Sequence, residues 1–350
     1  MKSRFQLYAR RSLYLLSACS VICYGSVLIP PDFFWPAIYL AFAIPVVIAI
    51  NICVLITLMI VRSKLLLFPL ITLVLATPFI LSTISIHKKE VPANSLSILS
   101  FNAHLFREHH NYSKFTLESI NWVVDDESDI KCIQEYSTNS QWRNLDVNGQ
   151  LKDKGYERFT FKATLPDTQH DLGMGIFSRY PMIDSGIVWE DKGSLNAGLF
   201  ADIRIGTDTI RIYNVHLASM NLELAQYKNT DNYLAKMRLL LEKLKYGSIQ
   251  RSEEIRTLLE HAASSPYRVI VCGDFNETPY GYNYRLINSR LSNVFEKAGN
   301  GFGFTYNSKM FFLRIDHQFA GDNIEPVSYS VDRSLKQSDH FPTKAVYRLN

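Results

Sequence analysis

Three long apolar stretches without charged residues lie near the N-terminus, and they constrain the fold of this chain more than any other feature. They cover residues 12–31, 33–61 and 65–86, so they contain 20, 29 and 22 residues. A helix needs about 20 apolar residues to cross the hydrocarbon core of a bilayer. Pro45 and Pro78 lie inside the second and third stretches, and packed membrane helices tolerate such prolines. The pattern therefore predicts three transmembrane helices.

Two other interpretations of these stretches are weaker. A cleaved signal peptide would account for the first stretch only, and no small-residue cleavage site stands out after it. Buried core helices of a water-soluble domain are a poor explanation for three such stretches in succession.

The basic residues around the stretches predict how they are oriented. Lysine and arginine precede the first stretch and separate the second from the third, whereas the segment around Asp32 has none. The positive-inside rule then places the N-terminus in the cytoplasm. Lys88 and Lys89 argue weakly against this orientation. We expect a multi-pass protein of the cell (inner) membrane that contacts the bilayer through residues 12–86 and has an extracytoplasmic C-terminal part.

Net charge separates this first segment from the rest of the chain. Residues 1–87 carry six basic and one acidic side chain, which leaves 31 of the 37 basic and 32 of the 33 acidic residues beyond them. The pI of 8.6 therefore reflects the membrane flanks. Proteins that bind nucleic acid usually have a basic excess in the binding domain. The C-terminal part has none overall, although a local patch at residues 236–245 remains an option.

The chain is predicted to have three parts. A transmembrane anchor covers residues 1–87, a linker covers 88–95, and one α/β domain covers 96–350. Helix-like patterns in the last part cover residues 234–244 and 252–263, the second with Ser252 as its N-cap. Alternating or β-branched runs predict strands at residues 96–101, 130–133, 173–178, 199–205, 209–215, 268–272, 311–319 and 343–349.

Cysteine positions do not indicate a disulfide framework. Cys132 and Cys272 lie in predicted strands, where a buried thiol is the more common state. Export from the cytoplasm would allow them to pair, and spacing alone leaves this open.

Polar side chains recur where the predicted strands end. They are Asn102, Glu135, His216, Asp274, Asn276, Asp316, Asp339 and His340. Carboxylates and amides suit a hard cation such as Mg²⁺, and imidazoles exchange protons near neutral pH. Any one of these residues alone is more often a turn former, a solvated side chain or a structural histidine. The ordered set predicts phosphoryl chemistry, in which a metal offsets phosphate charge and a base activates water.

The order of the segments around these residues resembles a known family. The segments are SFNAHLF, IQEY, GIFSRYP, NVHL, GDFNETP, RIDHQF and SDHFP, between residues 100 and 342. They resemble the endonuclease/exonuclease/phosphatase superfamily, which includes DNase I and neutral sphingomyelinases, in a bacterial membrane-tethered form. The resemblance implies a two-sheet α/β sandwich with the site at one edge of the sheets. It also implies a metal-dependent phosphoric ester hydrolase.

The same resemblance implies a metal site and a set of catalytic side chains. Glu135 is the expected principal ligand of Mg²⁺ or Mn²⁺, with Asn102 beside it and Asp339 completing the site; one ion or two are both compatible. The expected catalytic roles are as follows: a general base is oriented by a carboxylate, a second carboxylate orients the nucleophile, an amide holds a phosphate oxygen, and an imidazole stabilises the leaving group. These belong to His340 with Asp316, Asp274, Asn276 and His216, respectively.

Two departures from the family pattern and the choice of substrate stay open. His104 stands where a basic or aliphatic residue is expected, and Glu277 replaces an aspartate. The inositol-polyphosphate phosphatase segment is absent, and no segment resembles the DNA-gripping loops of abasic-site enzymes. The first hypothesis is a membrane-associated phosphodiesterase for a lipid headgroup or small phosphoester. The alternatives are an exported nuclease for DNA or RNA and a catalytically silent scaffold; no protein partner is indicated.

Overall fold

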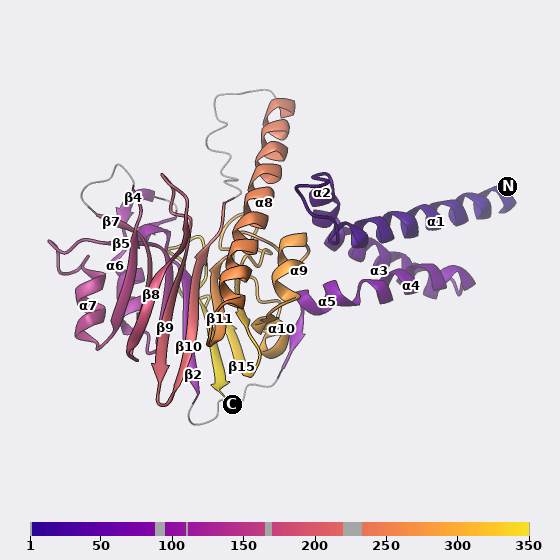
Figure 1. The fold of residues 1–350 in the computed structure, drawn as a ribbon. Coiled ribbons are helices and arrows are strands. Elements are labelled where there is room, and N and C mark those ends of the chain that lie inside the picture. The colour runs from indigo at the N-terminus through magenta and orange to yellow at the C-terminus, as the bar shows by residue number, and fades with distance from the viewer. Residues whose placement is uncertain (1, 88–94, 110, 165–169, 220–232, 350) are drawn as a thin grey trace. The chain divides into compact units, whose positions relative to one another are not determined.

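The chain divides into two compact units in the computed structural model (Figure 1). A helical unit contains Met1–Thr83, Asn221–Ser252 and Pro279–Leu286, and a sheet unit contains Ile84–Met220, Glu253–Thr278 and Ile287–Asn350. The predicted linker at 88–95 lies, except for Ser95, outside the described residues. The structure describes residues 2–87, 95–109, 111–164, 170–219 and 233–349, with the side chains of 2–6, 111–113 and 233 left out.

The first apolar stretch forms one helix, whereas the second and third are each divided. The breaks fall at Ala43 and Ala76, just before Pro45 and Pro78. Proline has no N–H and favours the first turn of a helix, so the chain starts a new helix there. The helices are α1 Lys2–Ser26, α2 Ala37–Phe42, α3 Ile44–Ile60, η1 Lys64–Leu66, α4 Leu67–Leu75 and α5 Thr77–Thr83.

The prediction of three continuous spanning helices is not met. Within the described residues, no single helix is both long enough and apolar enough to cross a bilayer. One pair of helices reaches that length and composition together, Lys64–Leu75 with Thr77–Thr83, across a bend of 57°.

Polar side chains connect the helices of this unit from inside. Asn51 on α3 has no exposed surface. Its Nδ2 donates to Ser20 Oγ on α1 at 2.9 Å, and its Oδ1 accepts from Thr72 Oγ1 on α4 at 2.7 Å. Large apolar side chains point outward instead, among them Ile22, Ile56, Met59, Ile60, Ile71 and Val74. The unit is therefore polar in part of its interior and apolar on much of its surface.

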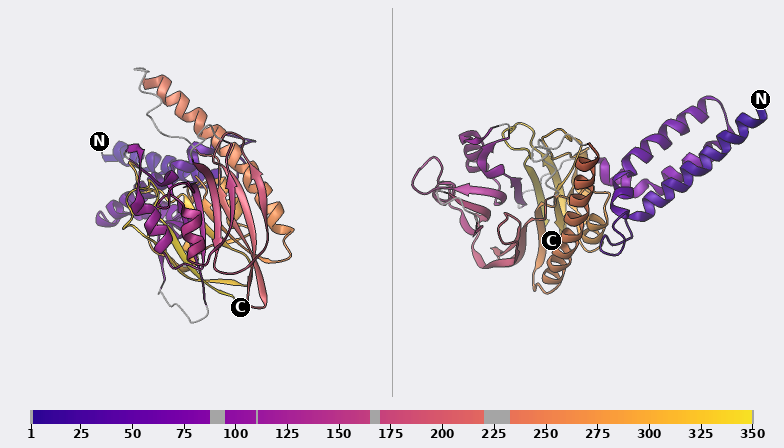
Figure 2. Two further views of the ribbon diagram at one scale, coloured as in Figure 1. Left: turned by 90° about the vertical axis from the view of Figure 1, so that its left-hand side faces the viewer. Right: turned by 90° about the horizontal axis from the view of Figure 1, so that it is seen from above.

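The sheet unit contains two six-stranded sheets that pack face to face (Figures 1 and 2). The order in one is β15-β16-β2-β5-β7-β6, and in the other β12-β14-β11-β10-β9-β8. The strands are β2 Leu96–Asn102, β5 Ile130–Thr138, β6 Glu157–Lys162, β7 Asp171–Ser178, β8 Met182–Glu190, β9 Ala197–Ile205, β10 Asp208–His216, β11 Arg268–Asp274, β12 Ser292–Asn293, β14 Asp316–Ala320, β15 Ile324–Val331 and β16 Thr343–Leu349. This arrangement confirms the two-sheet α/β sandwich.

Side chains from alternate positions of each strand form two cores. Ile98 and Cys132 meet Ile212 and Cys272 between the two sheets, as the period of two along a strand requires. Leu99 and Phe101 face the other side of their sheet and pack against helices that cover it, through residues such as Ile120 and Leu151. All five cysteines are free, and Cys132 and Cys272 are buried. The remaining elements are α6 Leu117–Asp125, α7 Val147–Asp153, α8 Tyr233–Ala263, α9 Tyr282–Asn288, α10 Val294–Ala298, η2 His104–Phe106, β1 Ser85–Ile86, β3 Arg107–Glu108, β4 Asn111–Phe115 and β13 Asn300–Gly301.

Two element predictions were wrong in their extent. Ser252 is not an N-cap, because the helix around it is α8, which starts at Tyr233. Its hydroxyl donates inside the helical unit to Asn283 Oδ1 at 2.6 Å. The strand predicted from Phe311 starts only at Asp316, and Phe311 and Phe312 form an exposed turn.

Candidate active site

Strand pairing explains why the expected site residues converge on one sheet edge. The central pairs β2–β5 and β10–β11 are parallel, so their carboxyl ends meet at the same edge. His216 pairs with Asp274 across β10 and β11, and Asp274 pairs with Asp316 across β11 and β14. In the other sheet Asn102 pairs with Gln134. Asn102 and Asp274, which are 172 positions apart, thereby come within hydrogen-bonding distance.

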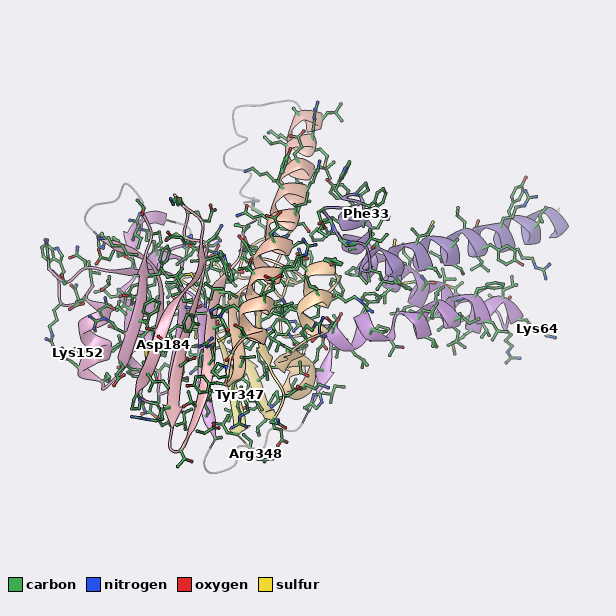
Figure 3. The ribbon with its side chains drawn as sticks, in the orientation of Figure 1. Phe33, Lys64, Lys152, Asp184, Tyr347 and Arg348 are labelled. Carbon is green, nitrogen blue, oxygen red and sulfur yellow. The ribbon has the colours of Figure 1, made fainter. Side chains whose placement is uncertain are left out.

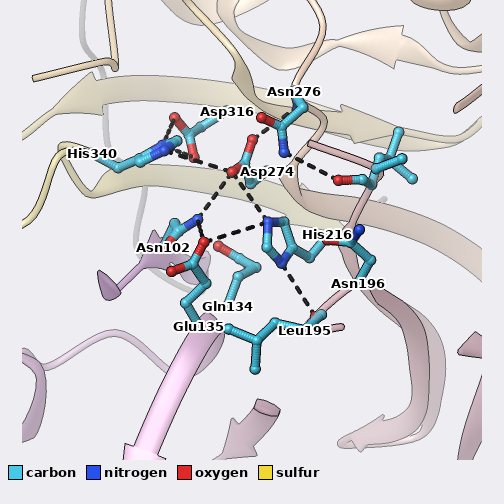
Figure 4. A network of polar contacts seen from close by, with 12 residues as sticks. Asn102, Gln134, Glu135, Leu195, Asn196, His216, Asp274, Asn276, Asp316 and His340 are labelled. Carbon is cyan, nitrogen blue, oxygen red and sulfur yellow. Dashed lines mark hydrogen bonds and ion pairs between the residues drawn. The ribbon is translucent and has the colours of Figure 1, made fainter. Parts of the chain in front are cut away.

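A β-bulge positions Glu135. The pairing of β5 with β7 shifts between Ile133 and Tyr136, and Glu135 has a φ of 42°. Bulges redirect a side chain and are frequent next to active sites. Gln134 stays buried and donates to Asn214 Oδ1 at 2.6 Å, while the Glu135 carboxylate is turned toward the network of Figure 4.

Four side chains from both sheets form the centre of this network (Figure 4). Asn102 Nδ2 donates to Asp274 Oδ2 at 3.0 Å and to Glu135 Oε1 at 3.2 Å. His216 Nε2 lies 3.6 Å from Asp274 Oδ2 and 3.7 Å from Glu135 Oε1. The other ring nitrogen, Nδ1, lies 3.2 Å from the carbonyl of Leu195. A carbonyl only accepts, so Nδ1 carries the proton and Nε2 faces the carboxylates.

His340 is held by a carboxylate on its far side. Its Nδ1 lies 2.8 Å from Asp316 Oδ2, and its Nε2 lies 3.7 Å from Asp274 Oδ2. Burial alone would lower the pKa of His340, but the carboxylates of Asp316, Asp274 and Asp339 outweigh it and hold the pKa well above its usual value. The ring is therefore oriented and made strongly basic by its neighbours.

The clustered carboxylates fit a divalent cation. Glu135, Asp274 and Asp316 converge here, and the imidazoles of His216 and His340 face them. Burial raises the pKa of Asp274, and the attraction of the two imidazoles offsets only part of this rise. The Asp274 carboxylate therefore has too little positive charge nearby to balance its own negative charge. Oxygen donors with surplus negative charge are what Mg²⁺ prefers in proteins.

The remaining expected residues lie at the border of the network. Asn276, with a φ of 48°, donates through Nδ2 to the carbonyl of Leu217 at 3.1 Å, and its backbone N–H donates to Asp274 Oδ1 at 2.9 Å. Asp339 is grouped with two imidazoles of a loop, those of His104 and His109. The structure thus brings seven expected residues into one network and puts Asp339 in a neighbouring group.

His109 was missed from the sequence. It stands five residues after His104 in an irregular segment, and nothing in its spacing indicates that the two rings meet. Only the left-handed turn at His104–Phe106 brings them together.

Comparisons with known proteins agree with this fold. A search of curated proteins gave no match. Solved structures with a similar fold include family proteins from Leptotrichia buccalis (16% identity, 72% of this chain and 99% of that chain, TM-score 0.53) and Bacteroides vulgatus (16%, 73% and 100%, TM-score 0.53). The human nocturnin catalytic domain with a bound sulfate is also similar (14% identity, 75% and 97% covered, TM-score 0.51).

Two family models match different parts of the chain. A model of a domain of unknown function matches residues 12–83. The model of the endonuclease/exonuclease/phosphatase family matches residues 99–340, which is more than half of the chain and includes every residue of the network. The chain belongs to the endonuclease/exonuclease/phosphatase family and is a phosphoric ester hydrolase.

Proposed function

We propose that this protein is a membrane-anchored phosphodiesterase that depends on Mg²⁺ or Mn²⁺ and hydrolyses a phosphoester with an apolar or lipid group. The observation that carries the proposal is the buried network in which Glu135, Asp274 and the Asp316–His340 pair converge. Positioning and electrostatics supply most of the rate in phosphoryl transfer, and this network provides both.

Glu135 and Asn102 are proposed to hold the cation. Both side chains already meet at 3.2 Å, and Asp274 adds a second carboxylate beside them. A bound dication there would neutralise charge on the phosphate and polarise it toward attack. The number of ions is not part of the proposal. Asp339, the third expected ligand, lies in the neighbouring group with His104 and His109.

His340 is proposed as the general base for an attacking water. Asp316 fixes the ring through Nδ1, so Nε2 is left to take the proton of a water that Asp274 orients. With a second proton on Nε2, His216 stabilises the charge that develops as the leaving group departs. The amide of Asn276 has a second N–H beyond the one bonded to Leu217, and this N–H holds a phosphate oxygen.

An aromatic turn on the segment that pairs with His340 favours an apolar substrate group over a nucleic acid. Phe311 and Phe312 are 67% and 53% exposed. The turn closes where Tyr306 N donates to the carbonyl of Leu313 at 3.1 Å, and Tyr306 itself pairs with His340. The Tyr306 and His340 rings also meet edge to face at 5.4 Å. Exposed phenyl rings on the segment that pairs with His340 suit an acyl chain or another apolar substituent.

Features of the helical unit support the membrane anchor. Its outward side chains are largely apolar, and its polar Asn51 is paired inside, which is the pattern that hydrocarbon favours. Phe33 is 85% exposed and lies at the opposite end of the N-terminal helices from Lys64 (Figure 3). Aromatic residues prefer membrane interfaces, and cytoplasmic loops are rich in lysine and arginine. We propose that the Lys64 end is cytoplasmic and the sheet unit extracytoplasmic.

The full-length chain, purified in mild detergent, provides the test. We would assay it with Mg²⁺, Mn²⁺ or EDTA against sphingomyelin and phosphatidylinositol vesicles, plasmid DNA, RNA and a chromogenic phosphodiester. EDTA, Glu135→Gln and His340→Gln are expected to abolish hydrolysis, and Mg²⁺ should restore only the EDTA-treated protein. Asp184→Asn and His87→Gln change exposed residues outside the site and serve as matched controls.

Two results would contradict the proposal. Full activity in Glu135→Gln or in His340→Gln would remove the substituted residue from the chemistry. Cleavage of DNA or RNA in preference to the lipid substrates would replace the proposed substrate class with nucleic acid.

A further inference from the structure

A second group of potential metal ligands lies on loops of the sheet unit. His104, His109 and Asp339 each offer one ligand atom, and these three atoms lie within 4.8 Å of one another. His104 is buried, and the other two side chains are partly buried. The imidazole rings meet edge to face, with centroids 5.8 Å apart and an interplanar angle of 68°. The two rings therefore contact each other directly, and each offers a nitrogen to the same group of ligand atoms.

The backbone around His104 fixes how its ring is presented. His104 Nδ1 lies 3.3 Å from the carbonyl of Arg107, so Nδ1 carries the proton and Nε2 is the nitrogen that can bind a metal. Metal-binding histidines are typically oriented by such a bond from the other nitrogen. His104, Leu105 and Phe106 also have φ values of 48°, 55° and 54°. Strained conformations of non-glycine residues gather at functional sites.

Hydrogen bonds join the loop of Asp339 to the segment that carries the two histidines. His109 N donates to the carbonyl of Gln337 at 2.8 Å, and Ser338 Oγ donates to the carbonyl of Asn102 at 2.8 Å. The two segments are therefore attached on both sides of the ligand group. The three ligands are held together by the fold and do not need a metal to assemble.

We propose that His104, His109 and Asp339 form a Zn²⁺ site that is separate from the oxygen-rich site of Glu135 and Asn102. Imidazole is a preferred ligand of Zn²⁺, whereas Mg²⁺ takes oxygen ligands. Three protein ligands with one open position is the arrangement of catalytic zinc sites. The open position accepts a water or a phosphate oxygen. Because Asp339 directly precedes His340, a Zn²⁺ ion here adds positive charge beside the proposed base.

Metal binding by the metal-free, full-length chain tests this site without an activity assay. Calorimetric titration with Zn²⁺ in the presence of excess Mg²⁺ should show one site per chain. His104→Gln and His109→Gln should each weaken Zn²⁺ binding at least about tenfold. His87→Gln removes an exposed histidine elsewhere and should leave the affinity unchanged. Glu135→Gln should retain Zn²⁺ binding, so this site and the proposed hydrolytic site succeed or fail separately.

X-ray absorption at the zinc edge of the wild-type protein gives a second readout that needs no variant. Two imidazole ligands are expected in the first coordination shell. A shell without imidazole, or no stoichiometric uptake of Zn²⁺, would overturn the proposal. Equal affinity in the wild type and in both histidine variants would overturn it as well, and would leave the group as a hydrogen-bonded cluster.

Discussion

The Asp316 carboxylate controls the proton affinity of His340, and this gives the first prediction. The two groups lie 2.8 Å apart, and Asp316 is the largest contributor among the carboxylates that raise the pKa of His340 against the effect of burial. A general base acts only when deprotonated, so the rate rises with pH through its pKa. Asp316→Asn lowers this pKa. The acidic limb of kcat/KM is therefore expected to move to lower pH, with a lower plateau because the ring loses its orientation.

The pH profile of kcat/KM at saturating Mg²⁺ provides the measurement. Asp322→Asn, an exposed aspartate of the same unit, is the control and should keep the wild-type profile. An acidic limb that does not move in Asp316→Asn would mean that another group than His340 takes the proton.

The buried Lys131 gives a second prediction at the residue scale, which concerns the pH dependence of folding stability. Its side chain has no exposed surface, and its Nζ lies 3.7 Å from Asp126 Oδ1 and donates to the carbonyl of Val123. Burial lowers its pKa to about 8, and the attraction of Asp126 offsets only part of this. The folded state then binds fewer protons than the unfolded state between about pH 8 and 10.5, so stability should rise with pH in this window, by up to about 3 kcal/mol.

Thermal unfolding followed by circular dichroism at pH 8 and pH 10 checks this. Tm of the wild type should increase over this range relative to Tm of Lys131→Met, which has no titrating amine at this position. Lys297→Met removes an exposed lysine and should follow the wild type. A wild type that gains nothing over Lys131→Met would show that the amine is neutral in both states or charged in both.

The contrast between Glu135 and His109 shows how far single residues can be predicted. Glu135 was placed in the site from its position after an apolar run, although the bulge that turns it there is a property of strand pairing. His109 has no comparable signal, because its position depends on three left-handed residues that no local pattern predicts.

At the scale of elements, the close approach of β10 and β11 gives the third prediction. Gly273 has a φ of 150°, and a Cβ added there would lie 1.9 Å from the carbonyl oxygen of Val215. The obstacle is backbone, so Gly273→Ala must push the two strands apart. His216 and Asp274 are partners on these strands and would separate with them. A displacement of about 1 Å costs about 100-fold in rate, and a loss of at least this size is expected.

Gly206→Ala is the matched control for this variant. Gly206 also has a positive φ, of 63°, but an added Cβ meets nothing within 4 Å. It should reduce Tm slightly through backbone strain and leave kcat near wild type. Similar kcat values for the two variants would show that strand separation does not govern the site.

The local sequence pattern predicted the strands whose side chains are mostly buried. It did not predict strands with largely exposed side chains. The central strands β2, β10 and β11 have buried residues throughout and were recognised as apolar runs. The edge strand β8 is half exposed and includes Asp184 and Gly186, so it has no clear alternation. Helix α8 is divided between the two units after Ser252, and the sequence pattern predicts two helices, one on either side of this point.

For the whole molecule, the length of the apolar stretches predicted a membrane anchor. The interruptions at Ala43 and Ala76 determine where its helices begin and end. Helix α3 has 17 residues, which is about 26 Å at 1.5 Å per residue, against a hydrocarbon core of about 30 Å. Hydropathy sums over a stretch and does not register that Pro45 and Pro78 start new helices. A short helix is accommodated by local thinning of the bilayer or by flanking residues that reach the interface. The anchor therefore remains our proposal and needs a direct test.

The topology of the chain provides that test and the last prediction. Alkaline phosphatase needs disulfides and becomes active only outside the cytoplasm, so it reports the side of the membrane on which its fusion point lies. The positive-inside rule places the segment around Asp32 outside and the Ser63 loop inside. Fusions after Asp32 and Asn350 should be active, and a fusion after Ser63 should be inactive. Activity only after Asp32 would put the sheet unit in the cytoplasm. No activity at any point, with the chain in the soluble fraction, would mean that the exposed apolar side chains of α1, α3 and α4 are covered by protein instead of lipid.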